Sequence, residues 1–165
     1  MSYILLCFDV DGVFHTNEID EPHISGNINP KLVEQLDDKL FAKSIVSPSP
    51  YYPKDSQNHS LFILHNKHEN NEERYKNLLE SYQYFTQIRR EKPIISLYIS
   101  DNEDIDQAKK ANFHYIDNIT FGKVLDSDLN ASSINYDVCS CEHLELLHYG
   151  NDHSCMICMN SCKLD

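Results

Sequence analysis

The sequence has few basic residues: 14 Lys and Arg stand against 26 Asp and Glu, giving a formal net charge of −12 over 165 residues. Affinity for nucleic acids comes largely from Lys and Arg clustered on the phosphate backbone. The densest basic cluster, Arg89-Arg90 with Lys92, is too small for such a surface. We therefore expect no nucleic-acid partner. A bound cation could still reverse the local charge and allow an acidic chain to bind a phosphorylated small molecule.

Long apolar runs are also missing, since no stretch approaches the roughly 18 residues that span a bilayer. The N-terminal segment MSYILLCFDVDG has no basic residues before its apolar run, unlike a signal peptide. These absences predict a cytoplasmic protein without a membrane-spanning segment. In that compartment the six cysteines would be mostly reduced, which favours metal binding over disulfides.

Apolar runs alternate with amphipathic stretches along residues 1–137, and no internal repeat interrupts them. Asn29 and Pro30 suit the N-cap and first position of a helix. Strands that alternate with helices predict an α/β domain, a Rossmann-like three-layer sandwich with a mainly parallel sheet. The expected strands are 3–8, 42–46, 61–64, 94–100 and 114–119, and the expected helices are 30–41, 70–88 and 104–113.

Polar side chains follow three of the expected strands. Asp9 and Asp11 come directly after residues 3–8, Ser47 follows the second strand, and Asp101 follows residues 94–100. Ligands of parallel sheets gather at the carboxyl ends of the strands. A carboxylate there could attack phosphorus, a second could transfer a proton, and Mg²⁺ would offset their mutual repulsion. We therefore expect a magnesium-dependent phosphoryl-transfer site at this edge.

Two stretches resemble motifs of the haloacid dehalogenase (HAD) superfamily. Residues 4–13, ILLCFDVDGV, look like the family's first motif, an apolar run followed by DxDG[TV]. Residues 98–117, YISDNEDIDQAKKANFHYID, resemble the region of its fourth motif. The resemblance implies a Rossmann-like core, Mg²⁺ dependence and phosphatase activity.

The resemblance also assigns roles. It implies that Asp9 is the nucleophile and a metal ligand, that Asp11 is the general acid/base and also lies at the metal, and that the Val10 carbonyl binds the metal. Ser47 resembles the second motif, whose hydroxyl holds the phosphoryl group, with Ser49 as the alternative.

The third and fourth motifs leave choices open. Either Lys76 or Arg74, near the start of helix 70–88, fits the third motif's cation. Asp101 is the best metal ligand of the fourth motif and Asp104 the second. Asn112 stands where the family usually has a helix-ending Gly, and Asn also tolerates the left-handed conformation.

The site is expected to be open. The segments on either side of Ser47 are too short for a folded cap domain, so residues 14–30 would form only a small flap. An open site suits a large phosphorylated substrate, or one covered by a neighbouring subunit. The alternative function is a catalytically weak HAD-like module that binds proteins through its C-terminal tail.

Residues 138–165 form a Cys/His-rich appendage with five of the six cysteines. Cys139 and Cys141, together with the C-x-x-C pair of Cys155 and Cys158, could make a closed structural Zn²⁺ site. Reduced, unliganded cysteines and disulfides are the other two interpretations. Residues that could substitute as ligands are Cys162, His143, His148 and His153.

Overall fold

The computed structural model describes residues 3–10, 12–14, 26, 28–46, 62–63, 74–101, 105–126, 148–149 and 154–155. Its main-sheet strands are β1 (Ile4–Phe8), β2 (Phe41–Ile45), β3 (Phe62–Ile63), β4 (Ile95–Ser100) and β5 (His114–Asp117). Its helices are α1 (Pro30–Glu34), α2 (Arg74–Arg89), α3 (Ile105–Lys110) and α4 (Asn118–Asp126). Two short strands follow, β6 (His148–Tyr149) and β7 (Ser154–Cys155).

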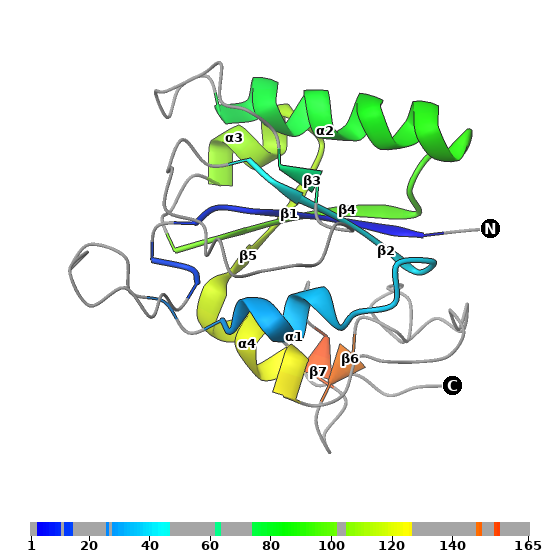
Figure 1. The fold of residues 1–165 in the computed structure, drawn as a ribbon. Coiled ribbons are helices and arrows are strands. Elements are labelled where there is room, and N and C mark those ends of the chain that lie inside the picture. Colours follow the sequence, from blue (N-terminus) through cyan, green and yellow to red (C-terminus); the bar gives the residue numbers. More distant parts are fainter. Residues whose placement is uncertain are drawn as a thin grey trace.

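The five strands form one parallel sheet in the order β3-β2-β1-β4-β5. Figure 1 shows α2 and α3 on one face and α1 and α4 on the other. The predicted α/β architecture with a parallel sheet is therefore confirmed. Because β2 and β4 flank β1 on opposite sides, the strand order reverses at β1, which makes its carboxyl end the expected place for a ligand.

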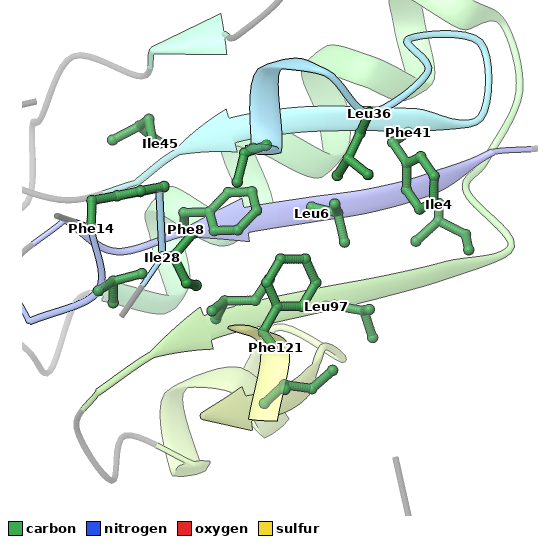
Figure 2. Packing of buried hydrophobic residues seen from close by; sticks show 14 of the residues in the cluster. Ile4, Leu6, Phe8, Phe14, Ile28, Leu36, Phe41, Ile45, Leu97 and Phe121 are labelled. Atoms are coloured by element: carbon green, nitrogen blue, oxygen red, sulfur yellow. The ribbon is translucent and has the colours of Figure 1, made fainter. Parts of the chain in front are cut away.

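β1 is buried on both faces, as its continuous apolar run predicts. Ile4, Leu6 and Phe8 belong to the hydrophobic cluster on the α1/α4 side, which Figure 2 shows. Leu5 and Cys7 point to the other face and pack in the cluster beneath α2 and α3. This alternation shows on which face of the sheet each residue of β1 lies, and it also determines the face of Asp9, the residue that follows the strand.

Helix α1 is shorter than the predicted helix 30–41. Its start agrees, because Asn29 caps it by accepting a 3.0 Å hydrogen bond from the Lys31 amide and Pro30 follows at the first position. It ends at Glu34, and Phe41 already belongs to β2. Lys43, buried in β2, accounts for this early end. Its ammonium donates to the carbonyls of Leu36 (2.8 Å) and Val33 (3.3 Å) and pairs with Asp38 (2.7 Å).

The end of β5 also differs from the prediction. The expected strand 114–119 stops at Asp117, and α4, which the sequence did not predict, begins at Asn118. The Asp117 carboxylate accepts hydrogen bonds from the Thr120 amide and hydroxyl, both at 2.8 Å. This cap stabilises the start of α4.

At Asn112, between α3 and β5, the expected left-handed turn is confirmed, with φ of 62°.

The tail contributes one antiparallel pair, in which His148 faces Cys155 and Tyr149 faces Ser154. Figure 1 shows this pair beside α4, on the α1/α4 side of the sheet. The side chains proposed as zinc ligands, those of Cys139, Cys141, Cys155 and Cys158, lie outside the described part of the chain. Among the described residues no helix is long and apolar enough to cross a membrane.

We expect Cys7 to be chemically inert in the folded chain. It lies beneath α2 beside Ser44 and Ser81, and burial raises the pKa of its thiol to about 12, against smaller opposing effects of hydrogen bonds from these two serines. Only the thiolate reacts readily, so iodoacetamide at pH 8 should modify Cys7 after unfolding and not before, as read by peptide mass spectrometry. Fast labelling of the native chain would contradict this burial.

The same shift in pKa makes folding depend on alkaline pH. The folded pKa of Cys7 lies above its ordinary value of 9.0, so the neutral thiol favours the fold fully below about pH 9. That contribution to the free energy of unfolding should be lost as the pH rises from about 9 toward 12.

Candidate functional site

Asp9 follows β1 directly and is almost completely buried, with 3% of its surface exposed. Its amide donates to the Ile99 carbonyl of β4 at 2.9 Å, which continues the pairing of β1 with β4. Its Oδ1 accepts hydrogen bonds from the Val10 amide at 2.9 Å and from Arg74 Nη1 at 3.3 Å. The alternation of β1 places Asp9 on the same face as Cys7, which is the face that α2 covers.

Arg74 supplies the positive charge beside Asp9. It is the first residue of α2, is 4% exposed, and forms an ion pair with the Asp9 carboxylate. Lys76, the other basic candidate, is half-buried on a different side of the helix. The structure thus brings Arg74 to the end of β1, in contact with Asp9.

Helix α2 is held against the sheet by polar contacts as well as by apolar packing. Asn77 donates to the Val46 carbonyl at 3.3 Å, and the hydroxyls of Ser81 and Ser44 lie 2.7 Å apart. Both contacts are buried, and both connect α2 to β2 or to the residue that follows it. They fix the helix start, and with it Arg74, relative to the carboxyl edge of the sheet.

Asp101 meets the loop after β1 at Gly12. It follows β4, and its carboxylate lies so close to the Cα of Gly12 that a Cβ there would overlap Asp101 Oδ2. Gly12 also has φ of 73°, a left-handed conformation that other residues adopt at a cost. The residues that follow β1 and β4 therefore lie together at one edge of the sheet, with Asp101 against Gly12.

The Val10 carbonyl, which the resemblance assigns to the metal, is engaged within the turn that follows β1. It accepts hydrogen bonds from the amides of Val13 (3.0 Å) and Phe14 (3.2 Å). A carbonyl oxygen has two lone pairs, and this turn uses both. Phe14 is held in turn by the core, where the centroid of its ring lies 5.4 Å from that of Phe8. Figure 2 shows both rings in the cluster. The turn is thus closed by its own backbone.

Three of the predicted site residues, Asp11, Ser47 and Asp104, lie outside the described residues. For Ser47 the preceding residue is informative: the Val46 amide donates to the Phe8 carbonyl at 2.9 Å, so β2 reaches the same edge as β1. Within the described ranges, no group of three or more His, Cys, Asp or Glu side chains is arranged to hold a metal ion.

Asn118 is a site residue that the sequence interpretation missed. It is 8% exposed, and its Nδ2 donates a 2.7 Å hydrogen bond to the Gly12 carbonyl. The available signal was the spacing of Asp117 and Thr120, which is typical of a helix N-terminus. That spacing would have placed Asn118 at the start of a helix facing the site.

The donor set fits a hard divalent cation. Two carboxylates, Asp9 and Asp101, follow adjacent strands, and the lack of a side chain at Gly12 leaves room for the Asp101 carboxylate. Mg²⁺ favours one or two carboxylates with water and phosphate oxygens as further ligands. Arg74 offsets the negative charge of Asp9 and so lowers the repulsion that an anionic ligand would meet there.

We expect Gly12→Ala to disrupt this arrangement. The new Cβ would displace the Asp101 carboxylate and strain a backbone with φ of 73°. The strain alone should lower the free energy of unfolding by about 1–2 kcal/mol, measurable by urea denaturation. Gly122→Ala, within α4, is the control and should not destabilise the chain in this way. Equal stability of Gly12→Ala and wild type would contradict the close approach of Asp101.

Comparison with models of protein families, with curated proteins and with solved structures finds no match to this chain. We therefore infer its function from the residues at the carboxyl edge of the sheet.

Proposed function

We propose that this chain is a Mg²⁺-dependent phosphohydrolase of the HAD type, in which Asp9 attacks phosphorus. The observation that carries the proposal is the ion pair of Asp9 with Arg74 at the point where the strand order reverses. A buried carboxylate at this position, with a guanidinium beside it and a second carboxylate from the next strand, suits the transfer of an anionic group. The resemblance to the HAD motifs supports the same reaction.

In the proposed first step an Asp9 carboxylate oxygen forms a bond to phosphorus while the ester P–O bond breaks. The product is an aspartyl-phosphate, and the leaving oxygen takes a proton from Asp11. In the second step Asp11 accepts a proton from water, whose oxygen attacks phosphorus and releases Asp9 with inorganic phosphate. Two chemical steps thus replace one difficult hydrolysis.

Arg74 orients Asp9 in this scheme. Its guanidinium and the Val10 amide both bond to Oδ1, which restricts rotation of the carboxylate. The same guanidinium can neutralise charge that develops on the phosphoryl oxygens. Ser47, two residues after β2 in the sequence, is proposed to donate its hydroxyl to one of those oxygens.

Asp9 and Asp101, with Asp11 and Asp104 as further candidates, would hold Mg²⁺. When bound, this ion supplies a positive charge that draws the phosphoryl group toward Asp9 and lowers the repulsion between two anions. A carboxylate nucleophile needs this help because it is negatively charged before it meets a phosphate.

The test is a screen of phosphomonoesters, small and macromolecular, with the purified full chain in Mg²⁺ and in EDTA. We expect phosphate release only with Mg²⁺. Quenching in acid during turnover should trap a phosphoryl group on the peptide that contains Asp9, detected by mass spectrometry. Turnover in EDTA, or none on any ester, would refute the proposal, and the second result would favour the protein-binding alternative.

A further inference from the structure

Asn118 connects two parts of the chain that are far apart in sequence. It begins α4, directly after β5, and its position is set by the cap in which Asp117 accepts a 2.8 Å hydrogen bond from the Thr120 amide. From this position its amide donates to the Gly12 carbonyl at 2.7 Å. A short, nearly buried bond of this kind restrains the loop that follows β1.

Among the described residues of this loop, Gly12 has a backbone carbonyl that is bound by a side chain. The neighbouring carbonyls are held by backbone amides. The Val10 carbonyl accepts from the amides of Val13 and Phe14, and the Val13 carbonyl accepts from the Ile28 amide at 3.0 Å. Gly12 instead receives its hydrogen bond from Asn118. Its backbone position therefore depends on the end of β5.

Gly12 also determines where Asp101 can lie, because the Asp101 carboxylate rests directly against its Cα. A displacement of the Gly12 peptide toward Asp101 would push this carboxylate away, and a displacement in the opposite direction would remove their contact. Asn118, Gly12 and Asp101 thus form one connected series across the ends of β5, β1 and β4.

We propose that Asn118 is a positioning residue for the metal site: through Gly12 it holds the Asp101 carboxylate in place to bind Mg²⁺. This inference rests on the proposed function, since Asp101 matters only if the site binds a cation. A neutral amide suits the task, because it donates to a carbonyl without bringing a positive charge beside the metal. Outer residues that orient metal ligands commonly contribute 10- to 100-fold to metal affinity.

The test measures Mg²⁺ binding directly, by isothermal titration calorimetry on the full chain. Asn118→Ala removes the donor, and Asn118→Leu removes it while filling its space. We expect both variants to bind Mg²⁺ about tenfold more weakly than wild type, or worse. Asp101→Asn should show a similar or larger loss. Thermal unfolding, followed by circular dichroism, checks that each variant is folded at the temperature of the titration.

Thr120→Val is the matched control. It removes the partly buried hydrogen bond of the Thr120 hydroxyl to Asp117. The Thr120 amide still donates to Asp117, so the cap that places the Asn118 amide is kept. It should lower the unfolding midpoint as Asn118→Ala does, yet keep the wild-type Mg²⁺ affinity. If Thr120→Val weakens Mg²⁺ binding equally, Asn118 has only a structural role.

The outcomes separate this inference from the proposed function. Wild-type Mg²⁺ affinity in Asn118→Ala and Asn118→Leu would overturn the inference and leave the phosphohydrolase proposal standing. Tight Mg²⁺ binding that depends on Asn118, in a chain that hydrolyses no ester, would overturn the proposed reaction alone. A wild-type chain that binds no Mg²⁺ would overturn both.

Discussion

Asp9→Asn should reduce phosphate release by about four orders of magnitude or more, the size of effect that follows removal of a nucleophile. Asn has nearly the same shape as Asp, and its oxygen can still accept from the Val10 amide, as Oδ1 of Asp9 does at 2.9 Å. The variant loses the negative oxygen that forms the bond to phosphorus. Steady-state hydrolysis of the best substrate from the screen measures the effect, and acid quenching should no longer trap a phosphoryl group.

Asp106→Asn is the control for this loss. Asp106 is a carboxylate in the first turn of α3, the helix that follows β4, and its side chain is exposed to solvent. Removing its charge should change kcat/KM by less than about threefold, because exposed charges act weakly through water. Hydrolysis that survives in Asp9→Asn, or a trapped phosphoryl group elsewhere in the chain, would show that Asp9 is not the nucleophile.

The sheet could be predicted from the sequence because its strands are continuous apolar runs. β1 and β4 are buried on both faces. Strands of this kind are short, nearly continuous apolar runs, which differ from the mixed polar and apolar pattern of a surface helix. Asp9 and Asp101 end two of these runs, so their meeting at one edge followed from the parallel order alone. This part of the site depends on secondary structure and chain direction, both of which leave clear signals in a sequence.

Helix ends were harder to predict because tertiary contacts set them. The leucines at 32, 36 and 40 suggested a long helix, but Leu32 is 38% exposed, and Val33 is buried in its place. The chain leaves the helix after Glu34, where Lys43 satisfies the carbonyls of Val33 and Leu36. A buried lysine within a strand carries no local signal of this role, since its partners depend on how the layers pack.

The choice between Arg74 and Lys76 could have been made from helical periodicity that includes polar residues. The buried face of α2 consists of positions spaced by three or four: Arg74, Asn77, Leu78, Ser81 and Phe85. Arg74 is four residues before Leu78 and so shares its face, whereas Lys76 does not. The sequence interpretation counted only apolar residues, and for that reason left the choice open.

Arg74→Met should show the second large effect, at least about a 100-fold loss of kcat/KM, the scale seen when a group that stabilises developing charge is removed. It should also lower the free energy of unfolding by about 3 kcal/mol in the absence of metal, because it leaves the Asp9 carboxylate buried without its cation. Met keeps most of the volume and apolar contact of the Arg side chain. Hydrolysis assays and urea denaturation measure the two losses.

Two controls separate the role of Arg74 at Asp9 from a general effect of positive charge on α2. One is the addition of Mg²⁺ to Arg74→Met, and the other is the variant Lys76→Met. Mg²⁺ should restore part of the stability lost in Arg74→Met, because it brings a positive charge back to the same carboxylate. Lys76→Met removes an equal charge from the same turn of the helix, on a half-buried side chain two residues from Arg74. It should change kcat/KM only a few-fold. A larger loss in Lys76→Met than in Arg74→Met would mean that the ion pair with Asp9 does not identify the phosphate-binding cation.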